Sequence, residues 1–168
     1  GQDNIIFRLH LLGWTQEEIG KVKGVELDQS NVNRRLCELP ELVKRLKDSF
    51  AKKKSIAEIA QYYNIGQTLT WALVLNGLAD ESRFETLGFR PQLYNVWNFA
   101  GCDERMGQDH AGRIPGQIVA NTLYYYTELN ALVVDPMAGG GTTNDACLLL
   151  GRRCRSYDIE PNHIEVAR

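Results

Sequence analysis

The chain has 168 residues, enough for one ordinary domain or two small ones, and its 43% hydrophobic and 24% charged residues are typical of globular proteins. No apolar run reaches the roughly 20 residues that span a bilayer, and no basic, apolar leader begins the sequence, so we expect neither a membrane protein nor a secreted one. The four cysteines show no CxxC pair and no regular spacing, which predicts reduced thiols in a cytoplasmic protein and no metal site.

Residues 1–88 are predicted to be all-helical, because apolar residues recur at helical spacing and strand-like runs are scarce. Helices are expected over residues 4–12 and 16–23, and a third helix is expected to start near Asp28 or Ser30. Two helices joined by a short turn that contains glycine form a helix-turn-helix unit. The sequence predicts one such unit here.

A second unit follows the first. A linker helix is expected over residues 41–50, and helices are expected over 56–63 and 67–75. Both WTQEEIGKVKGV and KSIAEIAQYYNI place a polar cap before Glu-Ile and a small residue, and then a turn. Thr15 with Glu18 three residues later predicts a capping box in the first segment, and Ser55 is the expected cap in the second.

Basic side chains concentrate over residues 34–54, where eight basic and three acidic residues leave an excess of +5. Such a stripe is typical of nucleic-acid surfaces, although a stripe alone is more often a solvated helix face. In a helix-turn-helix the second helix enters the major groove, where Arg, Asn and Gln read base edges. An amphipathic solvated helix accounts for the same residues equally well. The predicted DNA-binding residues are Gln29, Ser30, Asn31, Asn33, Arg34, Arg35 and Lys52.

The two predicted units differ as candidate DNA readers. Glu26 and Leu27 lengthen the turn of the first unit beyond three or four residues, which weakens that unit as a reader. The second unit is less basic. Units of this kind also serve purely as protein contacts, and that alternative stays open.

Residues 89–168 are predicted to open an α/β domain. A strand, a glycine turn, a helix and a second strand form a βαβ unit, which is expected to be right-handed with parallel strands. Because one unit cannot cover both faces of a parallel sheet, the sequence is expected to end inside this domain. The expected elements are a strand-like segment at 96–99, a loop over 101–116, a helix over 117–126, a buried strand at 131–134, a glycine turn at 138–141, a helix over 142–150, a strand at 155–158 and the start of a helix at 161–168.

The sequence also predicts which side chains of the helix 117–126 are buried. Its buried side is expected to carry Ile118, Val119, Leu123 and Tyr126. At least two of the three consecutive tyrosines, residues 124–126, are expected to pack inside the protein.

The segment VVDPMAGGGTT, residues 133–143, runs from a strand through glycines into a helix N-terminus. Missing side chains let a ligand approach the backbone there. A P-loop would need a lysine that is absent, and Asn144 stands where a dinucleotide fingerprint has its third glycine, so that match is partial. The third class of cofactor that binds at such a turn is S-adenosylmethionine, which has no phosphate and places its methionine part against the turn.

DPMAGGGTT resembles the D-P-F-x-G-x-G-T-T cofactor motif of the S-adenosylmethionine-dependent methyltransferases that act on adenine N6 or cytosine N4 in DNA. Upstream, GRIPGQIVANTLYYYT resembles the accessory cofactor motif of that family, and downstream LGRRCRSYDIEPNHIEVA resembles the segment that follows. The likeness covers residues 94–168. Met137 replaces the usual phenylalanine, and Gly140 stands where the family often has serine.

The resemblance implies an incomplete Rossmann-like methyltransferase domain with S-adenosylmethionine as its cofactor. Asp158 holds the acidic position at the end of the second strand, where a carboxylate can accept both ribose hydroxyls. The implied cofactor-binding residues are Pro115, Asp135, Pro136, Ala138, Gly139, Gly141 and Asp158.

The catalytic motif of the family is missing from the sequence. That motif is Asp, Asn or Ser followed by Pro-Pro and an aromatic residue, and none of the five prolines has a proline neighbour. We therefore predict no catalytic residue here and expect the chain to be a fragment of a DNA methyltransferase. Two alternatives stay open: a DNA-binding regulator whose Rossmann unit has no catalytic role, and a nicotinamide-dependent enzyme.

Overall fold

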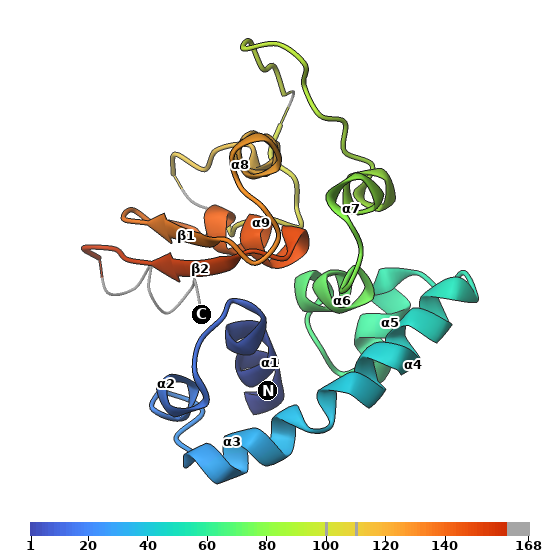
Figure 1. Cartoon of the computed structure of the whole chain (residues 1–168), viewed down its shortest axis with the longest axis vertical. Coiled ribbons are helices and arrows are strands. Elements are labelled where there is room, and N and C mark those ends of the chain that lie inside the picture. The colour runs from blue at the N-terminus through green and yellow to red at the C-terminus, as the bar shows by residue number, and fades with distance from the viewer. Residues whose placement is uncertain (100, 110, 161–168) are drawn as a thin grey trace.

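A computed structural model describes residues 1–99, 101–109 and 111–160. This part of the chain is mostly helical and carries a two-stranded parallel sheet (Figure 1). The elements are α1 (Gln2–Leu11), α2 (Gln16–Gly20), α3 (Gln29–Leu36), α4 (Leu39–Ala51), α5 (Ile56–Tyr63), α6 (Gln67–Val74), α7 (Asp80–Leu87), α8 (Gly116–Tyr126), β1 (Leu132–Asp135), α9 (Thr142–Leu150) and β2 (Arg153–Ser156).

Local capping signals define the starts of the short helices. Thr15 and Ser55 both form complete capping boxes with the glutamate three residues later, so both predicted caps are confirmed. Asp28 caps α3 through the backbone N–H of Asn31. These caps satisfy backbone donors that would otherwise lack partners at the first turn.

Helix α2 ends three residues earlier than the predicted helix 16–23. The chain folds back at its end, where the N–H of Leu27 donates to the carbonyl of Gly20. A Cβ at Gly20 would lie 2.2 Å from the Leu27 carbonyl oxygen, so only glycine fits this approach. The long turn between α2 and α3 is thereby held against α2.

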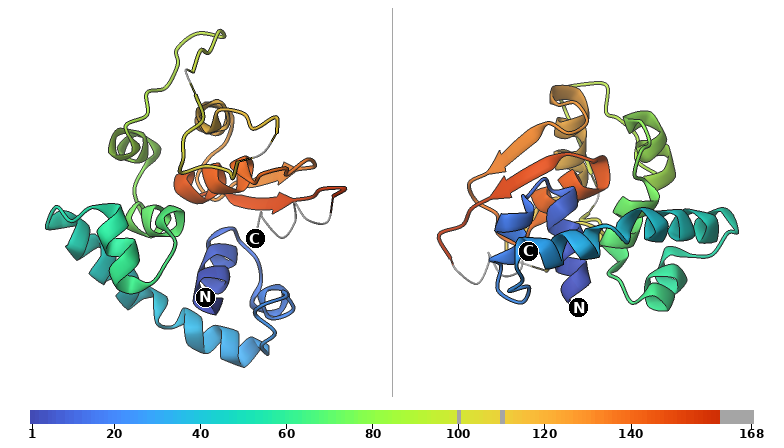
Figure 2. Two further views of the ribbon diagram at one scale, coloured as in Figure 1. Left: turned by 180° about the vertical axis from the view of Figure 1, so that it is seen from behind. Right: turned by 60° about the horizontal axis from the view of Figure 1, so that its bottom comes forward.

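The hydrophobic core has two clusters that meet at α6. The first joins α1 to α6, and the second joins α6 and α7 to α8, α9 and the sheet. Five of the eight residues of α6 are buried, and α6 packs against both α4 and α9. Both views of Figure 2 show the sheet on one side of the molecule and α4 on the other.

The position of α6 bears on the second predicted helix-turn-helix unit. Helix α6 is the second helix of that unit, the one that would enter a DNA groove. Only Gln67 of this helix is exposed, and the hydroxyl of Thr68 donates to the carbonyl of Arg105. Helix α6 therefore packs inside the protein, as in the alternative of a unit that makes protein contacts.

The sheet pairs β1 with β2 in parallel, as the sequence predicts, with Val133 opposite Cys154. Helices α8 and α9 share a core with these two residues. The N–H of Cys154 donates to the carbonyl of Leu12, so the turn after α1 occupies the outer edge of β2. Strand β2 begins and ends two residues earlier than the predicted strand 155–158, which leaves Asp158 beyond the strand.

A strand forms close to the predicted residues 131–134, but the prediction that this strand is buried is wrong. Leu132 and Val134 are 53% and 59% exposed, whereas Val133 packs against the second cluster. One face of β1 is covered by helices and the described chain leaves the other open. Alternate residues therefore differ in exposure.

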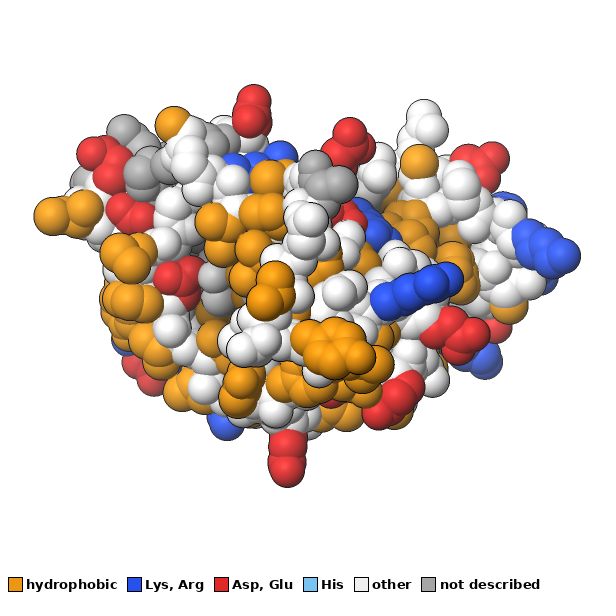
Figure 3. Space-filling view, turned by 90° about the horizontal axis from the view of Figure 1, so that it is seen from above, with side chains coloured by type: hydrophobic (Ala, Val, Ile, Leu, Met, Phe, Trp, Pro, Cys, Tyr) orange, Lys and Arg blue, Asp and Glu red, His pale blue; other side chains and the backbone are white. Residues whose placement is uncertain are grey.

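The strand-like segment 96–99 forms no strand. Its β-branched and aromatic residues have no neighbouring strand in the described part of the chain: Val96 is exposed, and Trp97 stacks on Tyr125 of α8. In the space-filling view from above, hydrophobic side chains cover much of the face that is shown (Figure 3).

The predicted burial of the tyrosines is wrong as well. Tyr126 is 78% exposed and Tyr125 is also exposed, so only Tyr124 packs into the core, against Phe84. On the buried side of α8, Leu123 is buried as predicted and Val119 packs against the second cluster, together with Ala120. Gly116 and Asn121 are also buried, and Asn121 accepts a hydrogen bond from the N–H of Gln92.

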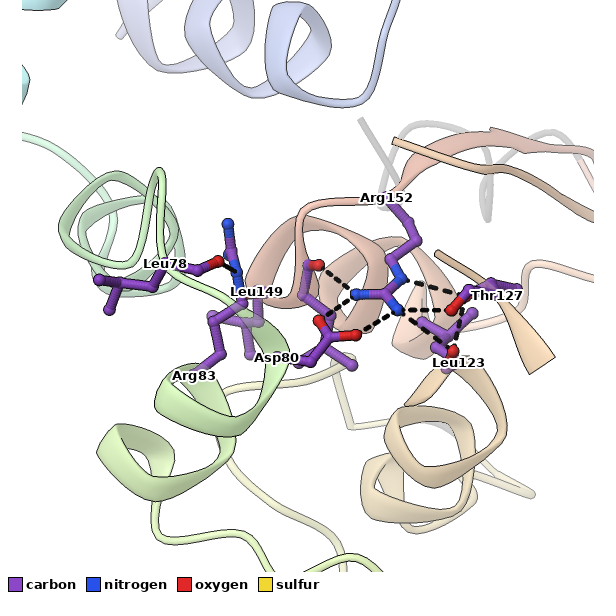
Figure 4. A network of polar contacts seen from close by, with 8 residues as sticks. Leu78, Asp80, Arg83, Leu123, Thr127, Leu149 and Arg152 are labelled. Carbon is purple, nitrogen blue, oxygen red and sulfur yellow. Dashed lines mark hydrogen bonds and ion pairs between the residues drawn. The ribbon is translucent and has the colours of Figure 1, made fainter. Parts of the chain in front are cut away.

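A buried polar network fastens α7 to the α/β part (Figure 4). Arg152 is fully buried and pairs with both carboxylate oxygens of Asp80 at the start of α7. It also donates to the carbonyls of Thr127 and Leu150. Arg83 of α7 donates to the carbonyl of Leu149, and its burial lowers the pKa of its guanidinium. A charge is stable in such a site only when its donors are satisfied.

No described helix combines the length and the apolar character needed to cross a membrane. The predicted helix at 161–168 lies outside the described residues.

Candidate functional site

A cleft of about 480 Å³ opens at the carboxyl ends of the two strands. One wall comes from the segment before α8, and the floor comes from the turn between β1 and α9. In open parallel sheets, ligands bind at this end of the strands. The lining residues are 111–114, 135–140, 142, 143, 158 and 159.

The glycine turn forms the floor of the cleft. Gly139 and Gly141 have φ of +49° and +80°, in the left-handed region that glycine adopts without strain. Gly141 is the N-cap of α9, and Thr142 and Thr143 of the first turn line the cleft. The start of α9 thus borders the space, and backbone N–H groups at a helix start favour acceptor groups of a ligand.

Two carboxylates stand at the ends of the strands. Asp135 ends β1, and its Oδ1 accepts a 3.0 Å hydrogen bond from the N–H of Met137. Asp158 follows β2, and its Oδ2 accepts a 2.8 Å hydrogen bond from the N–H of Gly139. The acid after one strand therefore holds the glycine turn after the other. Both side chains line the same cleft.

The structure brings together most of the predicted cofactor-binding residues. Asp135, Pro136, Ala138, Gly139 and Asp158 line the cleft. Pro115 and Gly141 do not. Pro115 is the N-cap of α8 and follows the lining segment directly, whereas Gly141 is buried beneath the turn.

Sequence reasoning missed the segment 103–109, which supports the glycine turn from outside. The N–H of Gln108 donates to the carbonyl of Gly140 at 2.8 Å. The N–H of Gly107 donates to Asp145 on α9, which also pairs with Arg8 of α1. These partners are up to 137 residues apart, so no local spacing signals them.

Six of the seven predicted DNA-binding residues lie on α3, and Lys52 lies at the end of α4. Gln29, Ser30, Asn33 and Arg34 are exposed, as is Lys52 at the end of α4. The other two are partly buried and engaged: Arg35 pairs with Asp3 at 3.5 Å, and Asn31 bonds to Asp28. Asn33 accepts a hydrogen bond from Gln16 of α2. Arg34 and Lys52 are thus the exposed cations of the predicted set.

Among the described residues, no group of three or more His, Cys, Asp or Glu side chains is placed to hold a metal ion.

Comparison with protein families identifies the class of protein. A family model described as DNA methylase, for methyltransferases of the N6 and N4 type, matches residues 31–168, and the chain belongs to this family. The family acts on DNA and generally uses S-adenosylmethionine. No curated protein and no solved structure gives a significant match.

Proposed function

We propose that the chain supplies the cofactor-binding and DNA-contacting parts of a methyltransferase that modifies adenine N6 or cytosine N4 in DNA. The observation that carries the proposal is the cleft, in which the glycine turn and two carboxylates meet at the strand ends. Because the chain belongs to the DNA methylase family, which generally uses S-adenosylmethionine, we propose this cleft as the site of that cofactor.

The cleft has the groups that S-adenosylmethionine requires. Asp158 offers carboxylate oxygens to the ribose hydroxyls, and the start of α9 faces the amino-acid part. Met137, Ile114 and Ile159 give the rim an apolar surface for the adenine ring. When bound, the cofactor supplies an activated sulfonium methyl group. The protein contributes orientation and exclusion of water.

Helix α3 is proposed as the DNA-contacting element. Its exposed residues combine side chains that read base edges with Arg34, which suits a phosphate. We propose an all-helical part to about residue 88 and the opening of a Rossmann-like domain from residue 89. The second core cluster crosses this boundary, since Phe84 and Leu123 both belong to it.

Calorimetric titration with S-adenosylmethionine or S-adenosylhomocysteine tests the cofactor. Asp158→Ala should weaken binding by about 1.5–3 kcal/mol, as expected for a hydrogen bond to a charged group. Asp158→Asn keeps one acceptor oxygen, which can serve the N–H of Gly139, but it loses the acceptor for the N–H of Glu160 and removes the negative charge. Asp48→Ala, on the exposed side of α4, is the matched control. Equal affinity of Asp158→Ala and wild type, or a preference for NAD, would sink the assignment.

A regulator without catalytic function remains the second candidate. The missing Pro-Pro-aromatic motif is the observation that favours it. Such a regulator would bind DNA through α3, and cofactor would then alter DNA affinity without any methyl transfer.

A further inference from the structure

The carboxylate of Asp145 joins three parts of the molecule at the first turn of α9. Its Oδ1 accepts a 2.6 Å hydrogen bond from Nη2 of Arg8 on α1, and its Oδ2 accepts a 2.7 Å bond from the N–H of Gly107. The side chains of Arg8 and Asp145 are only 16% and 13% exposed. A pair so far removed from water is held in one arrangement, because losing either partner leaves the other charge uncompensated.

Gly107 lies directly against the floor of the cleft. A Cβ at this position would come within 2.3 Å of Oγ1 of Thr142, which lines the cleft. The next residue, Gln108, donates its N–H to the carbonyl of Gly140 in the glycine turn. A displacement of Gly107 therefore acts on both Thr142 and Gly140.

We propose that Arg8 and Asp145 are positioning residues through which the helical part of the protein sets the shape of the cofactor cleft. This inference rests on the proposed function. Neither residue lines the cleft, so both act through Gly107 and Gln108. Because Arg8 belongs to α1, which packs against α3, the affinity of the cleft depends on the position of the helical part.

Titration with S-adenosylhomocysteine measures the effect on the cleft. Arg8→Gln and Asp145→Asn should each lower the affinity roughly tenfold, within the usual range of coupling between sites. The double variant should lose little more than either single variant, because both changes break one contact. Arg8→Lys retains the charge and should recover part of the affinity. Arg45→Gln breaks an exposed pair with Glu41, with side chains 62% and 59% exposed, and should bind like wild type.

Hydrogen exchange of the ligand-free protein gives a second, independent readout. In Arg8→Gln the amide of Gln108 should exchange faster, while amides in the middle of α4 keep their wild-type protection. A uniform rise in exchange across the chain would reduce the pair to a general structural role and overturn the proposal. So would folded variants with wild-type affinity. If wild type binds no S-adenosylhomocysteine, the proposed function fails, and local exchange at Gln108 then decides the positioning role by itself.

Discussion

The backbone conformation of the cleft floor depends on single glycine residues. Gly141 has φ of +80° and ψ of 19° at the N-cap of α9, a conformation in which a Cβ is strained. The side chain of Asp158 bonds to Gly139, so the turn and the acid hold each other. A substitution at a glycine with positive φ therefore tests the turn without removing any polar contact.

Gly141→Ala should lower the free energy of unfolding by about 1–2 kcal/mol, the usual cost of the left-handed region for a residue with a Cβ. Urea denaturation followed by circular dichroism measures this difference. Gly140→Ser, which introduces the residue often found at this position in the family, should cost less. If the two variants were equally stable, the strained turn would not be the conformation in solution.

Five of the residues that line the cleft belong to the predicted set, because the motif that predicts them is local. The acids, the glycines and the helix start lie within one βαβ unit, and their order in the chain determines their place at the strand ends. Arg8 and Asp145 could not be found in this way. Nothing in the neighbouring sequence distinguishes Arg8 from a solvated arginine, and only the tertiary fold brings Arg8 of α1 to Asp145 of α9.

At the scale of elements, capping and helical periodicity predicted α1 to α6 well, because these signals act within a few residues. The predictions failed where tertiary packing decides. Segment 96–99 has the composition of a strand but no strand beside it among the described residues, and Tyr126, predicted on the buried side of α8, is exposed. Helix α7, held by the contacts of Arg152, was not predicted separately.

Arg34 of α3 and Lys52 at the end of α4 should bind DNA through charge. Replacing Arg34 and Lys52 by alanine should reduce the magnitude of the negative slope of log affinity against log salt concentration by about 0.9 for each phosphate that the protein no longer neutralises. Fluorescence anisotropy with a labelled duplex at several salt concentrations measures this slope. Arg90→Ala removes an exposed cation outside the proposed DNA-contacting part and should leave the slope unchanged. An unchanged slope in the double variant would mean that this surface does not bind DNA.

At the scale of the whole molecule, the helical and α/β parts are joined by shared structure. Cluster residues from α6 to α9 pack together, Arg152 ties α7 to α8 and α9, and Arg8 ties α1 to α9. The turn after α1 also occupies the outer edge of β2. The sequence predicted two consecutive parts, but it carried no sign of these contacts, because each joins residues far apart in the chain.

The 168-residue chain by itself should bind the cofactor but transfer no methyl group to DNA. Transfer requires side-chain and backbone acceptors for the hydrogens of the target amine and an aromatic ring for the flipped base, and the sequence has no Pro-Pro-aromatic motif to provide them. Positioning the acceptor is a large part of such catalysis, since the donor is already activated. Incorporation of tritium from labelled S-adenosylmethionine into unmethylated genomic DNA measures transfer, with an intact adenine methyltransferase as the positive control. Incorporation by this chain alone, abolished in Asp158→Ala, would show that other residues of the chain hold the target amine.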